Sequence, residues 1–213
     1  MKVETLTVGP FQENCYLVVD ERTNSAALVD PGSEPEKVIA AVEKSGAKLE
    51  AIWITHAHVD HVGAIASVKN KWDVPVHLHP KDKRLYQAAG RQAEVYGIPF
   101  EEPPEPDLEF SEGQTLSLGE KTFSVMHVPG HAPGHVVIHG NGIALVGDCL
   151  FAGSIGRTDL PFCNPADLAL SLERIAALPP DTVVYPGHGM STTIKEERES
   201  NPFLNGTARI VQS

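Results

Sequence analysis

Four side chains that commonly bind metal ions lie within six consecutive positions, directly after the apolar run at residues 51–54. These side chains are His56, His58, Asp60 and His61. Neutral imidazole and carboxylate are the ligands that zinc and similar divalent ions prefer. Alternate residues share one side of an extended segment but not of a helix. The spacing therefore predicts a metal-binding loop at the end of a buried strand, with the next helix beginning near residue 62. The alternative, a solvated polar loop, would need four ligand-type residues in six positions by chance.

Three later side chains could complete this site. Each follows an apolar segment and is flanked by glycine or proline, and they are His131, Asp148 and His188. Tight loops at strand ends allow side chains from separate strands to converge on one place. Taken singly, a histidine or aspartate in a turn is common and needs no function. Together with the first loop, the three indicate a metal site that several loops share.

The remaining histidines are expected to lie outside the ligand set. His135 comes four residues after His131. Metal-bound imidazoles need hydrogen-bond partners that fix their tautomer, so His135 is predicted to support the ligands in this way. We expect the other histidines to be packed or exposed without binding a metal, and these are His77, His79, His127 and His139.

Short strands and amphipathic helices in two similar halves must position these loops. Apolar patterns predict strands at residues 3–8, 15–19, 26–29, 49–55, 74–78, 108–110, 115–118, 122–127, 136–139, 143–146 and 182–185. Helices are expected at 34–44, 62–71, 81–90, 165–177 and 193–200. Ser33 is the expected cap of the first helix. A proline-rich, acidic connector at 99–107 separates the halves. The pattern predicts one domain, 1–213, of the α/β (α+β) class, with two sheets face to face and helices outside.

Composition argues against several kinds of partner. The chain has 213 residues and a formal net charge of −11, whereas nucleic-acid-binding proteins normally carry a basic surface. No apolar run approaches the roughly 18 residues that a membrane span needs, and the N-terminus does not resemble a signal peptide. Three cysteines do not suggest a disulfide framework. We expect a cytoplasmic protein that binds a small molecule, with neither nucleic acid nor membrane as a partner. These features do not predict an oligomeric state.

The order of the ligand motifs is similar to that of a known family. His-x-His-x-Asp-His at 56–61, followed by His131, Asp148 and His188 on glycine-rich loops, resembles the metallo-β-lactamase-fold hydrolases. Residues 153–159 and 199–203 resemble the glyoxalase II (hydroxyacylglutathione hydrolase) branch, particularly its short bacterial members. The resemblance implies an αββα sandwich of two mixed sheets flanked by helices. It also implies a chain without the C-terminal helical region that binds glutathione in longer members.

The resemblance further implies a site with two divalent ions, zinc or alternatively iron or manganese. One ion would be held by His56, His58 and His131, and the other by Asp60, His61 and His188. Asp148 would bridge them, and Asp60 and Asp148 would be the catalytic carboxylates. A hydroxide bridging the ions would then attack a thioester carbonyl. No protein nucleophile is needed, which agrees with the absence of a Gly-x-Ser-x-Gly motif.

The implied substrate is a thioester such as lactoylglutathione, which would yield lactate and glutathione. Arg157 is the candidate substrate contact, although Asp159 could instead hold this arginine locally. The main alternative is a persulfide dioxygenase on the same fold, with one iron held by His58, His131 and Asp148. A lactonase is a further alternative. So is a non-catalytic metal-binding module, which would leave no open coordination position.

Overall fold

Four of the seven predicted ligands follow a strand of the first of two large sheets. In the computed structural model, which describes residues 1–210, its order is β1-β2-β3-β4-β5-β6. Its strands are β1 (Lys2–Val8), β2 (Glu13–Asp20), β3 (Ser25–Val29), β4 (Lys48–Trp53), β5 (Val76–Leu78) and β6 (Leu108–Glu109). Strands β1 to β3 pair antiparallel, and β3 to β6 pair parallel. Parallel pairs need crossover connections, and helices α1 (Pro35–Ser45) and α3 (Ile65–Lys71) supply two of them.

The second sheet has the order β14-β13-β10-β9-β8-β7. Its strands are β7 (Thr115–Leu118), β8 (Lys121–His127), β9 (Val136–Gly140), β10 (Ile143–Gly147), β13 (Val183–Pro186) and β14 (Thr192–Thr193). Only β10 and β13 pair in parallel, and helix α6 (Pro165–Ala176) lies between them in the chain. A small hairpin of β11 (Leu150–Phe151) and β12 (Ser154–Ile155) precedes α6, and α7 (Ile194–Ser200) follows β14.

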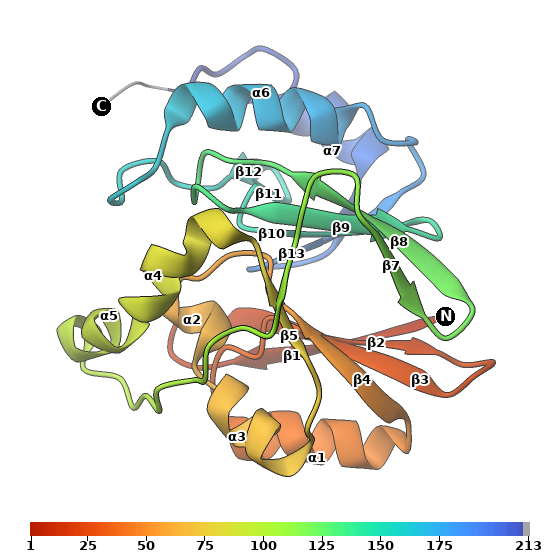
Figure 1. The fold of residues 1–213 in the computed structure, drawn as a ribbon. Helices are drawn as coiled ribbons and strands as arrows, with labels where there is room; N and C mark the ends of the chain where they lie inside the picture. Colours follow the sequence, from red (N-terminus) through yellow and green to blue (C-terminus); the bar gives the residue numbers. More distant parts are fainter. Residues whose placement is uncertain (211–213) are drawn as a thin grey trace.

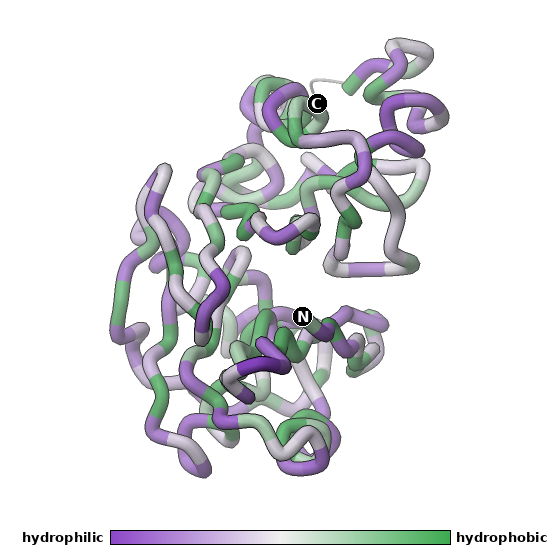
Figure 2. The backbone as a smooth tube through the Cα atoms, turned by 90° about the vertical axis from the view of Figure 1, so that its right-hand side faces the viewer, coloured by the Kyte–Doolittle hydropathy of each residue, from purple (hydrophilic) through white to green (hydrophobic). Residues whose placement is uncertain are grey.

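Side chains alternate along each strand, so each sheet contributes to two cores. Between the sheets, Trp53 of β4 packs edge to face on Phe123 of β8, with ring centroids 5.5 Å apart. The outer face of the first sheet packs on α1 and α3, and that of the second on α6 and α7. Figure 1 shows the resulting order of layers, and Figure 2 shows hydrophobic and hydrophilic stretches alternating along the chain. The predicted α/β sandwich of two mixed sheets flanked by helices is confirmed.

Several predicted helix boundaries are wrong. Helix α1 begins at Pro35 after Glu34, whose left-handed backbone (φ 49°) and lack of a side-chain cap replace the expected Ser33 cap. The helix expected at 81–90 is a 3-10 turn, Pro80–Asp82, followed by α4 (Lys83–Gln87) and α5 (Ala89–Tyr96). The helix expected from residue 62 is preceded by a short helix, α2 (Val59–Val62).

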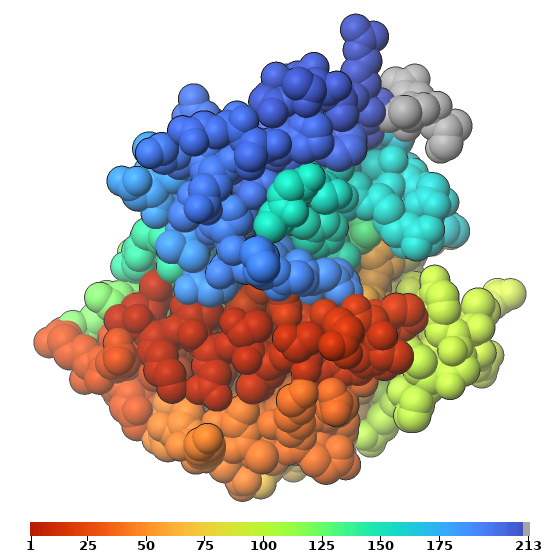
Figure 3. All heavy atoms as spheres, turned by 180° about the vertical axis from the view of Figure 1, so that it is seen from behind, coloured from red at the N-terminus to blue at the C-terminus, as the bar shows by residue number. Residues whose placement is uncertain are grey.

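The two sheets meet through segments far apart in the sequence. Asn14 of β2 donates from its backbone N–H to the carbonyl of Gly187, 2.7 Å away, and its side-chain amide donates to Pro186 and Gly189. Figure 3 shows the N-terminal strands, in red, lying against the C-terminal part of the chain, in blue. These bonds fix the loop after β13 against the first sheet. Within residues 1–210, no helix has the length and apolar character that crossing a membrane requires.

Candidate metal centre

All seven predicted metal ligands come together at one edge of the sandwich. They lie after β4 (His56, His58), in α2 (Asp60, His61), between β8 and β9 (His131), after β10 (Asp148) and after β13 (His188). The expectation that Asp60 and His61 lie in a loop before the next helix is wrong, because they lie in the short helix α2, which packs on Gly32. A Cβ atom on Gly32 would lie 1.6 Å from the carbonyl oxygen of Asp60. The absence of a side chain at Gly32 is therefore what lets α2 approach.

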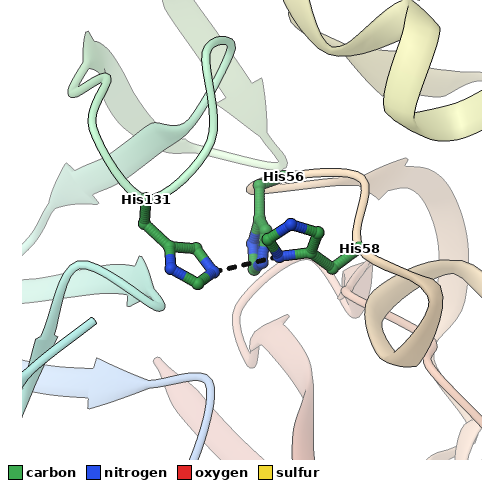
Figure 4. Close-up of side chains that lie close together, drawn as sticks. All are labelled: His56, His58 and His131. Carbon is green, nitrogen blue, oxygen red and sulfur yellow. Dashed lines mark hydrogen bonds between the residues drawn. The ribbon is translucent and has the colours of Figure 1, made fainter. Parts of the chain in front are cut away.

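The first ligand group is made only of imidazoles. His56, His58 and His131 offer ring nitrogens that all lie within 4.8 Å of one another. Nδ1 of His58 is 3.0 Å from Nε2 of His131. Figure 4 shows the three rings pointing toward one another from two separate loops. Three converging imidazole nitrogens are an arrangement that divalent ions bind well.

The second ligand group contains a carboxylate. Asp60, His61 and His188 offer ligand atoms that also lie within 4.8 Å of one another. Oδ2 of Asp60 is 3.3 Å from Nε2 of His188 and 3.9 Å from Nε2 of His61. The group therefore has the mixed imidazole and carboxylate character that zinc, iron and manganese accept.

Asp148 lies between the two groups. Its Oδ2 is 3.6 Å from Nε2 of His131 in the first group and 3.5 Å from Nε2 of His188 in the second. Its Oδ1 is 3.5 Å from Nε2 of His61. Glycine is required next to it, since a Cβ atom on Gly187 would lie 2.0 Å from Oδ1 of Asp148. This position is the one that a carboxylate shared by two ions would occupy.

The outer nitrogens of these histidines are held by oxygen atoms. Nδ1 of His131 is 2.9 Å from the carbonyl oxygen of Arg157, and Nδ1 of His188 is 3.1 Å from that of Phe11. A carbonyl can only accept, so each Nδ1 carries a proton, and Nε2 is the ring nitrogen that faces the centre. This arrangement is typical of histidines that bind metals.

The same arrangement holds for the two deepest histidines. Nδ1 of His61 is 3.1 Å from Oδ2 of Asp30, and Nδ1 of His56 is 3.1 Å from Oγ1 of Thr55. The Thr55 hydroxyl donates to Asp30 over 2.6 Å, so its lone pairs are free to accept from His56. Both rings consequently direct Nε2 inward, as the nitrogen that a metal ion would bind.

Sequence reasoning did not identify Asp30 and Glu13. Asp30 is buried with a left-handed backbone (φ 49°), and its carboxylate accepts from Thr55 and His61. Its oxygens also lie near His56, but because they are already used in these bonds we assign Asp30 a supporting role. Oε1 of Glu13 is 3.8 Å from Nδ1 of His61. The segment Asp30-Pro31-Gly32, directly after a buried strand, was the available signal for Asp30.

Buried polar atoms without partners mark the centre. Among the described residues, they include Nε2 of His56, Nε2 of His61 and Oδ1 of Asp148. Burying a polar atom without a partner costs free energy, and nearly all such atoms in proteins are satisfied. All three atoms face the space between the predicted ligands. The donor set and its unsatisfied atoms therefore fit divalent metal ions.

The pKa values differ between the two groups. Burial lowers the pKa of His56 well below its usual value, and burial together with His131 lowers the pKa of His58 to about 3. Burial also lowers the pKa of His188, but its bonds to Asp148 and Asp60 outweigh burial and raise it to about 9. The first group is thus neutral and ready to bind a cation. In the second, the carboxylates favour a positive charge.

Asp82 joins the two loops that carry the first group. Its buried carboxylate accepts hydrogen bonds from the backbone N–H of Ala57, over 3.0 Å, and from that of Gly134. Burial raises the pKa of Asp82 to about 6, against the effect of these two bonds, so the group is ionised at neutral pH. Ala57 lies between His56 and His58, and Gly134 is close to His131. One carboxylate therefore holds both loops in register.

His135 and Arg157 lie beside the centre. His135 stacks on His56 with centroids 4.7 Å apart, and its Nε2 accepts from the backbone N–H of Asp148 over 3.0 Å. It thus contacts the backbone of one predicted ligand and the ring of another. The Arg157 guanidinium binds both oxygens of Asp159 over 2.6 and 2.7 Å, while its carbonyl holds His131. The predicted roles of His135 and Arg157 stay predictions. Of the other histidines, His77 stacks on Phe110 and His79 on His127.

A cavity of about 370 Å³ opens over the ligands. It is lined by ligand side chains from both groups, by Asp148, by Arg157 and by apolar residues that include Phe11, Tyr96, Phe151 and Ile155. Its volume lies within the range of small-molecule sites. The metal centre is accordingly accessible to a substrate from one side.

The fold and the ligand set together identify the family. Residues 8–188 match the model of the metallo-beta-lactamase superfamily, and the chain belongs to that superfamily, as its motifs predicted. The chain is 40% identical to hydroxyacylglutathione hydrolase GloC of Haemophilus influenzae, over 96% of this chain and 99% of that protein.

Two solved structures are similar throughout. One is TTHA1623 in a di-iron-bound form, which is 45% identical in sequence, with a TM-score of 0.88. The match covers 95% of this chain and 100% of TTHA1623. The other is the B3 metallo-beta-lactamase BLEG-1, which is 35% identical in sequence, with a TM-score of 0.90. The match covers 96% of this chain and 100% of BLEG-1. These likenesses and the ligand cluster indicate a metal-dependent hydrolase with divalent metals.

Proposed function

We propose that the protein hydrolyses thioesters with two divalent ions, and that a hydroxyacylglutathione such as lactoylglutathione is a substrate. The main support is the position of Asp148, whose Oδ2 lies 3.6 Å from Nε2 of His131 in the first group and 3.5 Å from Nε2 of His188 in the second. Each group also contains a buried histidine nitrogen without a hydrogen-bond partner. The likeness to the relative named hydroxyacylglutathione hydrolase supports a thioester over other substrates.

The chain's own residues suit this reaction. One ion would be held by His56, His58 and His131, and the other by Asp60, His61 and His188. Asp148 would bind both ions. When bound, two such ions supply hydroxide near neutral pH and polarise a carbonyl. The Nδ1 hydrogen bonds of His131 and His188 orient both rings so that their Nε2 atoms would bind the ions.

No protein nucleophile is needed next to the centre. Cys149 follows Asp148 but is fully buried, and burial and Asp148 raise the pKa of its thiol well above the usual value. A protonated, buried thiol is a poor nucleophile. The thiolate that leaves a thioester is stable without protonation, so no general acid is required either. The side chains therefore need only bind metal and position the substrate.

The proposal is tested with protein purified without chelator. Its metal content is measured, and its turnover of lactoylglutathione, of a β-lactam and of glutathione persulfide is compared. We expect two ions per chain, efficient thioester hydrolysis that EDTA abolishes, and negligible activity on the β-lactam. One iron per chain with oxygen uptake on the persulfide would contradict the proposal and favour the dioxygenase. Efficient β-lactam hydrolysis alone would favour an activity like that of BLEG-1.

A further inference from the structure

A second hollow adjoins the cavity over the metal centre. Its volume is about 420 Å³, and it is lined by residues of helices α4 and α5 and by residues 160–162, in the loop before α6. It shares four lining residues with the first cavity, and these are His58, Gln92, Tyr96 and Leu160. The two spaces are therefore adjacent, and a side chain of the first ligand group borders both. We refer to the second space as the acyl groove.

The acyl groove is apolar. Its lining includes Leu85, Val95, Leu160 and Phe162, while Arg91 is its only residue of the Lys, Arg, Asp or Glu type. Val95 is 77% exposed, Tyr96 50% and Phe162 52%. Large hydrophobic side chains that gather on the surface mark binding sites. Here they gather at the entrance to the metal centre, in a chain with a net charge of −11.

The backbone of Phe162 gives an independent indication. Its φ is 71°, in the left-handed region, which costs roughly 1–2 kcal/mol for a bulky residue. Burial of the ring does not compensate for this cost, because half of the side chain stays exposed. Arg84 contacts the ring face, with its guanidinium 5.0 Å from the ring centroid. Residues with backbone strain of this kind cluster at active sites and at segments that hold ligands.

We propose that the acyl groove binds the apolar acyl chain of the thioester substrate, and that the preferred acyl group is longer than lactoyl. Cellular thiols such as glutathione are polar and rich in amides, so the apolar part of a natural thioester is its acyl group. A groove that begins at His58 is placed to receive that group while the carbonyl lies over the metal centre. This inference rests on the proposed thioesterase function and narrows its substrate class.

The first test compares acetylglutathione with octanoylglutathione. One fully buried methylene favours binding by roughly fourfold, so six partly buried ones are expected to raise kcat/KM by at least about tenfold. In the double variant Val95→Ser and Phe162→Ala the preference should fall to about threefold or less, mainly through KM. Both residues are exposed, so the fold should tolerate the changes, which thermal melting verifies.

Leu170→Ser is the matched control, because Leu170 of α6 is 61% exposed and does not line the groove. This variant should keep the full preference for octanoylglutathione. Equal kcat/KM for the two substrates in the wild type would contradict the proposal that the acyl groove binds the acyl chain. An unchanged preference for octanoylglutathione in the double variant would also contradict it. Hydrolysis of lactoylglutathione would persist in either case, so the proposed function would stand.

The second test does not depend on turnover. Calorimetry measures the binding of S-methylglutathione and S-octylglutathione, thioethers that cannot be hydrolysed, to the metal-loaded protein. We expect S-octylglutathione to bind at least about tenfold more tightly, and the double variant to lose this difference. Equal binding would overturn the groove. A further outcome is that the wild type binds S-octylglutathione more tightly, and the double variant loses this difference, while no thioester is hydrolysed. That result would support a site for apolar chains here and would contradict the thioesterase function.

Discussion

The two ligand groups of this centre differ in composition and in access. The first is made of three buried imidazoles, whereas the second contains Asp60 and His188, which are partly exposed. In the first group, burial keeps the histidines neutral. In the second, the carboxylates of Asp148 and Asp60 outweigh burial and raise the pKa of His61. We infer that the first group retains its ion and that the second, more open group exchanges its ion more readily.

Removing the shared carboxylate should have the largest effect on both groups. Asp148→Ala takes away the only carboxylate within residues 1–210 that lies within 4 Å of both His131 and His188. Turnover is expected to fall by about a thousandfold, an activation free energy of about 4 kcal/mol, and ions should be lost from both groups. Metal analysis and thioester kinetics check this result. A variant that still held two ions would contradict the bridging role.

The next comparison separates the groups. His131→Ala should weaken the first site, and His188→Ala the second, so each variant is expected to bind about one ion per chain. The ion that remains in His188→Ala should be held more tightly on dialysis, because its ligands are buried and already oriented. His139→Ala, a histidine substitution on β9 away from the centre, serves as the control. Equal retention in both variants would remove the distinction between the groups.

A smaller effect is expected from the buried clamp of the first group. Asp82→Asn leaves one oxygen for two backbone donors, so one loop is released. We expect a loss of roughly 10–100-fold in metal affinity, as for other residues that orient ligands, and the ion of the first group should be the one affected. Asp73→Asn, the same substitution at a fully exposed position, is the control. Unchanged metal affinity in Asp82→Asn would show that the two loops keep their positions without the Asp82 carboxylate.

The smallest effect is expected from Arg157→Ala. The guanidinium binds Asp159 in an exposed pair, and such pairs contribute about 0–1 kcal/mol. The His131 contact comes from the backbone carbonyl, which the substitution retains. KM for lactoylglutathione should therefore change by less than about fivefold. A much larger rise in KM would support the prediction that Arg157 contacts the substrate.

The sequence was informative where residue type alone carries the chemistry. Histidines and aspartates at His-x-His-x-Asp-His and on glycine-rich loops after apolar strands indicated the centre, and period-two patterns predicted most strands. The α2 turn was missed because it depends on the space above Gly32, which is distant in the chain. Glu13, Asp30 and Asp82 were missed for a similar reason. Their importance comes from the partners that folding brings to them, and an isolated carboxylate in a sequence does not reveal those partners.

Stepwise addition of zinc to metal-free protein, with lactoylglutathione hydrolysis followed at each step, tests the two-ion centre most directly. We expect turnover to stay low while the first, buried group fills, then to rise with the second ion and level off at two ions per chain. Full turnover at one ion per chain would contradict the account.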